Sequence, residues 1–164
     1  MKSIKFFVAA LVLVAAVPMF GQTATDDLDV TATVDAVCTI STTPVAFGLY
    51  DPLAAVDNDN QGTVVVTCTR GSSGLSIDLG AGTNNGSGPI AGRAMDNGAG
   101  EFLSYELYTT AARATVWGSG ASGVAIANAP SSAARTFDVF GRIPALQDAA
   151  VGSYADVVVA TINY

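Results

Sequence analysis

The sequence predicts an all-β protein, and three observations lead to that fold class. Short segments alternate apolar and polar residues, as strands with one buried face do. Clusters of Gly, Asn, Asp and Pro separate these segments, and the β-forming residues Thr and Val are abundant. Beyond the N-terminus, no window of about twelve residues keeps the 3.6-residue period of a helix. Many short strands with turns between them are typical of a two-sheet β-sandwich.

Residues 1–24 are expected to be a secretory signal peptide. Lys2 and Lys5 flank the start of an apolar run over 4–17, and Pro18 and small residues follow. An N-terminal membrane anchor is the alternative, but the run is shorter than the roughly 20 residues of a spanning helix. Cleavage would leave about 140 residues, which suits one domain.

The mature chain is expected to be strongly acidic. It keeps five basic residues, all Arg, against fourteen acidic residues, a formal charge of −9. Such a charge disfavours nucleic acid and anionic membranes as partners.

The first segment of the mature chain, residues 27–36, has the pattern of a half-buried strand. Its apolar side chains are Leu28, Val30, Ala32 and Val34. Aspartates and threonines occupy the opposite face, so a one-residue slip would bring charge into a core. Two interpretations are open. The segment is either the first strand of its own sheet or a strand that fills the core of another molecule.

Further strands are predicted over 62–69, 75–80, 102–108, 135–143 and 154–164. In the last of these, one face carries Val158, Ala160, Ile162 and Tyr164. The segments 81–92 and 118–124 are loops by composition. Cys38 and Cys68 are expected to form one disulfide, because exported proteins oxidise paired cysteines. That bond would contribute roughly 3–4 kcal/mol by closing a loop of about 30 residues.

The sequence offers little chemistry. It contains no His, and two cysteines alone do not make a zinc site, so no catalytic residue, metal or cofactor is predicted. Asp57 and Asp59 could form a glycosidase pair, and 57–62 faintly resembles a calcium loop, but a solvated turn explains both. Trp117 could be a sugar platform or a core residue. A ligand-binding module or adhesin that uses the loops 81–100 or 118–130 is the alternative to a structural subunit.

Four blocks of the chain carry a family resemblance. They are "CTISTTPVAFGLYDP" (38–52), "LSYELYTTAARATVWG" (103–118), "FGRIPALQ" (140–147) and "GSYADVVVATINY" (152–164). In this order they resemble the spore coat protein U domain family, which overlaps the Csu-type pilins of the archaic chaperone–usher pathway. Thr110 stands where that family usually has Asp, and Leu146 where Gly is usual.

The resemblance implies an incomplete immunoglobulin-like sandwich over 37–164 that lacks its final strand. A periplasmic chaperone would cover the open core first, pairing with the C-terminal strand through Val158, Ala160, Ile162 and Tyr164. At an outer-membrane usher, residues 25–36 of the next identical or related subunit would then replace the chaperone. Such donation yields a fimbrial homopolymer or coat at the cell surface that supports adhesion and biofilm formation. A stand-alone secreted adhesin is the alternative.

Overall fold

The computed structural model describes residues 21–164, so the predicted signal peptide lies almost entirely outside the described part of the chain. The chain divides into a segment that ends at Thr33 and a body, Val34–Tyr164. Residues 21–33 form no strand or helix. No helix within 21–164 has the length and apolar character needed to cross a membrane.

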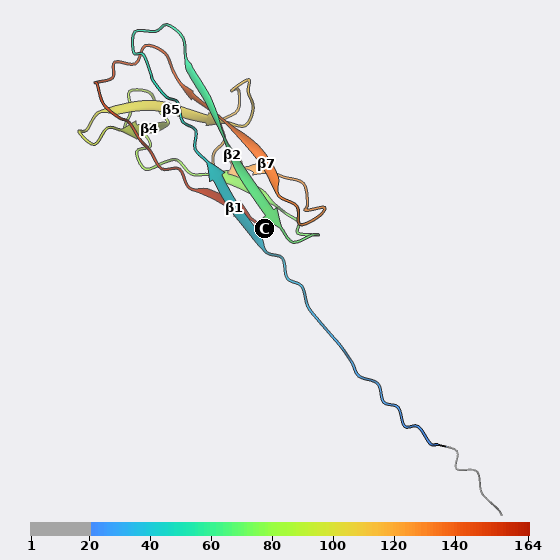
Figure 1. Ribbon diagram of the computed structural model, residues 1–164. Helices are drawn as coiled ribbons and strands as arrows, with labels where there is room; N and C mark the ends of the chain where they lie inside the picture. Colours follow the sequence, from blue (N-terminus) through green and yellow to red (C-terminus); the bar gives the residue numbers. More distant parts are fainter. Residues whose placement is uncertain (1–20) are drawn as a thin grey trace, which may run out of the picture. The chain divides into compact units, whose positions relative to one another are not determined.

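The body is built from strands and one short 3-10 turn (Figure 1). The elements are β1 (Cys38–Thr43), β2 (Asn58–Cys68), β3 (Ser76–Leu79), β4 (Arg93–Asp96), β5 (Phe102–Tyr108), η1 (Gly120–Ser122), β6 (Val124–Ala125), β7 (Arg135–Ile143) and β8 (Ala160–Asn163). These confirm the all-β prediction.

The strands form two sheets. The larger sheet has the order β1-β2-β7-β5-β4 and the smaller has the order β6-β3-β8, with every neighbouring pair antiparallel. β2 is the longest strand, with 11 residues, and runs from one end of the body to the other. Asn58 pairs with Ile143 at the end that we call the apex, and Cys68 pairs with Cys38 at the end that we call the base.

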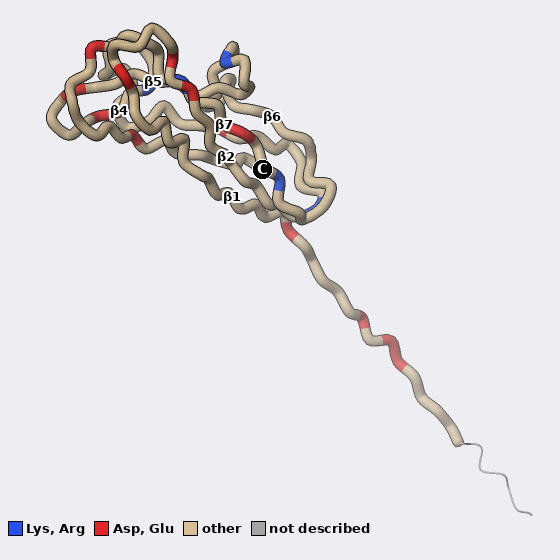
Figure 2. The backbone as a smooth tube through the Cα atoms, turned by 45° about the horizontal axis from the view of Figure 1, so that its top comes forward, with Lys and Arg blue, Asp and Glu red and all other residues tan. Residues whose placement is uncertain are grey.

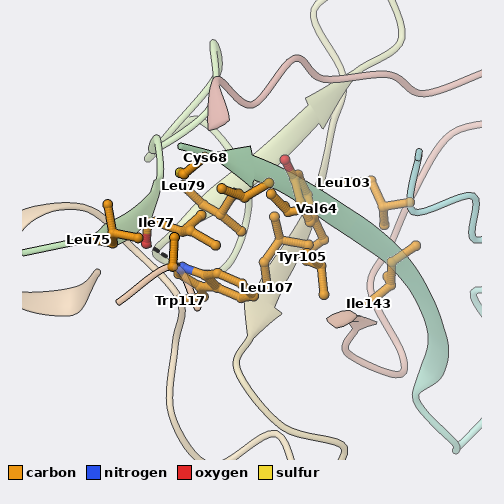
Figure 3. Packing of buried hydrophobic residues seen from close by; sticks show 13 residues of the cluster. Val64, Cys68, Leu75, Ile77, Leu79, Leu103, Tyr105, Leu107, Trp117 and Ile143 are labelled. Atoms are coloured by element: carbon orange, nitrogen blue, oxygen red, sulfur yellow. Dashed lines mark hydrogen bonds between the residues drawn. The ribbon is translucent and has the colours of Figure 1, made fainter. Parts of the chain in front are cut away.

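The core lies between the sheets and follows the period-2 pattern. Val64 and Val66 of β2 and Ile77 of β3 are at most 1% exposed. Trp117 is also buried, and its indole N–H donates to the carbonyl of Ile77 at 2.9 Å (Figure 3). The core interpretation of Trp117 is therefore confirmed. Cys38 and Cys68 form the predicted disulfide between the paired ends of β1 and β2.

One glycine of the larger sheet is required by packing. A Cβ on Gly141 of β7 would lie 2.6 Å from Cγ1 of Val45 and 2.7 Å from Cζ of Phe47. The segment that follows β1 therefore lies directly on the inner face of β7 at this position. This contact places Val45 and Phe47 at the border of the core.

Several predicted boundaries were wrong. The strand expected over 62–69 begins earlier, at Asn58, because Asp59 pairs with Arg142 in the ladder instead of lying in a loop. The strand expected over 154–164 is regular only at Ala160–Asn163; before it, Ala155 makes an isolated bridge to Asp96. β4 and β6 were not predicted, since both are short and lie next to glycine-rich turns. Residues 27–36 form no strand in the single chain, so pairing within their own sheet is not seen, and donation to another molecule stays a prediction.

Candidate functional site: an open groove between two sheet edges

The site begins with two strand edges that meet without pairing. β1 is the outer strand of the larger sheet, and β8 is the outer strand of the smaller one. The two strands contact each other, yet no ladder joins them within residues 21–164. An uncovered edge presents backbone N–H and C=O groups that can pair with an added strand.

The register shows which backbone groups of β8 point outward. The N–H of Gly80 donates to the carbonyl of Val159 at 2.8 Å. The N–H of Leu79 points away from β8 and donates to the carbonyl of Gly118. In an antiparallel pair, bonded and non-bonded positions alternate. Thr161 and Asn163 therefore face β3, while Ala160 and Ile162 direct their N–H and C=O groups toward β1 and the open edge.

The same argument applies to β1. The N–H of Thr69 donates to the carbonyl of Val37 at 2.8 Å, so Val37 and every second residue after it face β2. Ile40 and Thr42 consequently direct their backbone groups toward β8. Both facing edges can therefore donate hydrogen bonds to, and accept them from, one strand inserted between them.

Two pockets continue this open edge toward the apex. The first, of about 460 Å³, lies between residues 42–47 and 154–160. The second, of about 550 Å³, lies between residues 45–52 and 149–154. The two share Val45, Ala46, Phe47, Met95 and Tyr154, so they form one groove. We call it the edge groove.

The floor of the edge groove is the hydrophobic core itself. Val64, Leu79 and Leu107 line it and are otherwise buried (Figure 3). Tyr105 also lines the floor, and its ring meets Phe47 edge-on with centroids 6.1 Å apart. An apolar strand laid in this groove would therefore complete the core and not merely cover a surface.

One polar contact fixes the middle of the groove. The hydroxyl of Tyr105 donates to Oδ2 of Asp156 at 2.7 Å, and Oδ1 of Asp156 accepts the N–H of Thr83 at 2.8 Å. Burial, followed by the bond to Asp156, raises the pKa of the Tyr105 hydroxyl far above its ordinary value, so it stays protonated and a donor. This contact holds the 154–159 segment beside the core although it is not a regular strand.

The predicted site residues fall into two groups. Val158, Ala160 and Ile162 are half-buried on one face, and Val158 and Ala160 line the groove, whereas Tyr164 is exposed. Leu28, Val30, Ala32 and Val34 are exposed and belong to no strand, and Leu28 is 88% exposed. Their role as a donated strand stays a prediction.

The weaker candidates have structural roles instead. Asp59 receives two hydrogen bonds from Arg142, at 2.7 and 2.8 Å, and an ion pair with Arg113 at 3.2 Å. The bond from Arg142 holds the pKa of the Asp59 carboxyl below its ordinary value. Asp57 pairs with Arg142 as well, at 3.1 Å. No cluster of metal-ligating side chains was found within residues 21–164.

Reasoning from the sequence missed the residues that shape the groove. Val45, Phe47, Tyr105 and Asp156 come from three separate segments, and only the fold brings them together. The residues "PVAFG" (44–48) carried one available signal, because apolar residues with strand-like spacing follow a proline there. Of the loop ranges 81–100 and 118–130, these two pockets include Met95 alone.

Comparison with known proteins agrees with this architecture. The Spore Coat Protein U domain matches residues 24–161. Protein U of Myxococcus xanthus is 35% identical over 181 aligned positions that span all of both chains.

The fold also resembles a chain in the crystal structure of the CsuC–CsuE chaperone–tip adhesion subunit pre-assembly complex, from the archaic chaperone–usher Csu pili of Acinetobacter baumannii. The TM-score is 0.55 at 22% identity, over 80% of this chain and 41% of that one. This chain spans less than half of that solved chain. At this identity the likeness shows a shared fold and nothing more. By the domain match and the full-length relative, the chain belongs to the spore coat protein U domain family.

Proposed function

We propose that this protein is an exported, non-enzymatic subunit of a chaperone–usher surface fibre or coat. The observation that carries the proposal is the edge groove, an apolar opening into the core between two unpaired strand edges. A folded protein that leaves such an edge open invites pairing with another chain. Strand addition from a partner uses these backbone groups for affinity and the side-chain pockets for specificity.

The segment 25–36 of another copy is the proposed occupant of the groove. Its apolar residues recur every second position, so Leu28, Val30, Ala32 and Val34 can enter the core together. Each of the three larger side chains would contribute roughly 1.5–3 kcal/mol on full burial. Asp27, Asp29 and Asp35 stay on the outer face and penalise any odd-numbered shift in register.

Before assembly, a periplasmic chaperone is proposed to cover the same opening. It would pair with the outward-facing backbone of Ala160 and Ile162 and contact the half-buried face that includes Val158, with Tyr164 at its end. An outer-membrane usher would be the place where the next subunit replaces the chaperone. Because donation from copy to copy does not close on itself, the product is a homopolymer at the cell surface, and adhesion and biofilm formation are its proposed roles.

The test is gel electrophoresis of protein sheared from the cell surface, with and without boiling. Subunits linked by inserted strands give a ladder in SDS that collapses to one band on boiling. Val30→Asp should abolish the ladder, because it places a charge in the neighbour's core. Thr31→Asp is the matched control, since it adds the same charge on the outer face and should leave the ladder intact. A ladder that survives Val30→Asp or deletion of 25–36 would rule out this donor segment.

A further inference from the structure

Large apolar side chains are exposed together at the apex of the body. They are Leu49, Leu53, Val56, Leu146 and Val151, and we call them the apex patch. Leu49 is 92% exposed, and the side chain of Val151 is fully exposed. Contiguous exposed apolar surface on a folded protein commonly marks an interaction site.

Hydrogen bonds join the two loops that carry the apex patch. The hydroxyl of Tyr50 donates to the carbonyl of Pro144 at 2.9 Å and accepts the N–H of Gln147 at 2.9 Å. The loops 48–52 and 149–154 also line the same pocket at the apex end of the edge groove. Leu49 and Val151 therefore lie at the apex end of the groove itself, and Leu53, Val56 and Leu146 lie on the same two connections, β1 to β2 and β7 to β8.

The chain enters the body at the opposite end. Val37 bonds to Thr69 at the base, next to the disulfide, and only Val37 separates the proposed donor segment from β1. β2 runs from apex to base over 11 residues, a length of about 35 Å at the usual strand rise. A copy that donates its segment must therefore place its own base at the point where that segment leaves the acceptor's groove.

That point is the apex of the acceptor. The base of each copy already adjoins the neighbour that accepts its own segment, so a second neighbour has to approach from the other end. The donated strand then runs opposite to residues 154–163, which pass from the apex end of the groove to the base beside Ser76. Its last residues emerge between the loops of the apex patch.

The two ends are chemically complementary. At the base, Val37 and Tyr164 are exposed apolar or aromatic side chains, and the exposed Arg70 forms no ion pair within residues 21–164. At the apex, Asp51 and Asp148 are exposed beside the patch. Figure 2 shows acidic residues of the body gathered at the end where β4 and β5 lie. Opposite charges at the two ends favour base-to-apex contact and disfavour apex-to-apex contact.

We propose that the apex patch is the docking surface for the base of the next copy of this chain, with Arg70 of that copy facing Asp51 and Asp148. This inference rests on the proposed strand donation, and it adds a contact between the bodies. The contact would restrain the angle between successive subunits, because without it the two bodies are joined only by the donated strand and the short backbone link before Val37, which is bonded to Thr69.

Photocrosslinking of the assembled fibre tests the contact. One preparation carries p-benzoyl-phenylalanine in place of Val151, and a second carries it in place of Asp138, which is exposed in the middle of the larger sheet's outer face. Irradiation should join two chains through position 151 in a boil-resistant adduct, several-fold more abundant than the adduct from position 138. Mass spectrometry should map the partner peptide to 37, 69–73 or 127–134.

A charge exchange sharpens the test. Arg70→Glu should reduce the adduct from position 151 several-fold, and Asp51→Arg together with Asp148→Arg in the same chain should restore it. If the unboiled ladder is normal but the adduct is absent, equals that from position 138, or maps elsewhere or to another protein, the docking proposal is wrong and strand donation stands. If folded protein gives no ladder at all, the proposed function fails and the docking proposal fails with it.

Discussion

The gap between the two sheets is bridged on one flank of this sandwich and open on the other. On one flank, the buried Arg93 of β4 reaches across to the smaller sheet and donates to the carbonyl oxygens of Leu79 and Gly80 and of Trp117, at 2.6–3.1 Å. It also pairs with Glu106. On the other flank, β1 and β8 approach each other with outward-facing backbone and a groove between them. A side chain closes the gap on one flank, and the gap on the other flank is open in the single chain.

The same apolar alternation gives different burial inside a sheet and at the open edge. Val64 and Val66 on β2 are almost completely buried, whereas Val158, Ala160 and Ile162 are only half-buried. The difference does not come from the residues, which are all aliphatic. It comes from position, because β2 lies between two paired strands whereas, within residues 21–164, β8 pairs with β3 alone. Adding or removing neighbours is the way to test this.

The largest effect is expected from closing the open flank covalently. Residues 25–36 appended after Tyr164 through a short Gly-Ser linker would enter the groove from the base and run opposite to β8. Burial of Leu28, Val30 and Val34 should raise the free energy of unfolding by about 5 kcal/mol. Urea denaturation measures the change. The same extension with Val30→Asp is the control and should give little gain. Equal gains from both would show that the groove does not select the apolar face.

Opening the closed flank is expected to have the next largest effect. Arg93→Met leaves three backbone carbonyls without their side-chain donor in a buried site and removes the cation that pairs with Glu106. This should lower the free energy of unfolding by about 3–5 kcal/mol, as measured by denaturant titration. Arg142→Met is the matched control, because its ion pairs are partly exposed and should be worth about 1 kcal/mol or less. Similar costs for both would mean that Arg93 does not bridge the sheets.

The sequence was informative where burial follows local pattern. The fold class, the disulfide and the positions of β2, β3, β5 and β7 follow from alternation, turn residues and paired cysteines. β2 extends past the prediction because its polar start is held by Arg142, a partner 83 residues away. For the end of the chain, the predicted buried face was right but the strand length was not, since in the described part of the chain β8 pairs with β3 alone and only over Ala160–Asn163.

The groove was beyond sequence reasoning for the same physical reason. Its wall depends on Phe47 lying over Gly141 and on Asp156 accepting from Tyr105, and these contacts join residues that are 94 and 51 positions apart. Periodicity reports which face of one strand is buried, but it does not report which edge is unpaired. The family resemblance supplied the expectation of an open edge, and the register of β1 and β8 locates it.

A smaller effect is expected from the ion pairs of Asp59 on the outer face of the larger sheet. Arg142 lowers the pKa of this carboxyl in the folded state, so its contribution to stability is complete above the ordinary Asp pKa of about 4 and is lost as the pH falls below it. Asp59→Asn should therefore cost about 1 kcal/mol or less at pH 7. The difference from the parent should shrink toward pH 2–3. Unfolding curves at both pH values measure it. Asp138→Asn is the control and should leave the free energy of unfolding nearly unchanged at both pH values.

The smallest effect concerns two residues with left-handed backbone, Leu146 with φ 59° and Arg113 with φ 51°. The exposed side chain of Leu146 gives little burial in return for this strain. Leu146→Gly should raise the free energy of unfolding by about 0.5–1 kcal/mol, because the relief of strain exceeds the entropy cost of glycine.

Arg113 has the same left-handed backbone as Leu146, but its side chain makes several contacts. Its guanidinium pairs with Asp59, donates to the carbonyl of Gly141 and lies 5.9 Å from the ring centroid of Phe140. Arg113→Gly relieves the same strain but loses these contacts, so it should destabilise the subunit. Thermal denaturation of both variants separates backbone strain from side-chain bonding. If Leu146→Gly also destabilised the subunit, Leu146 would already contribute packing at the apex in the single chain. In that case the apex patch would be part of the fold before any neighbour docks on it.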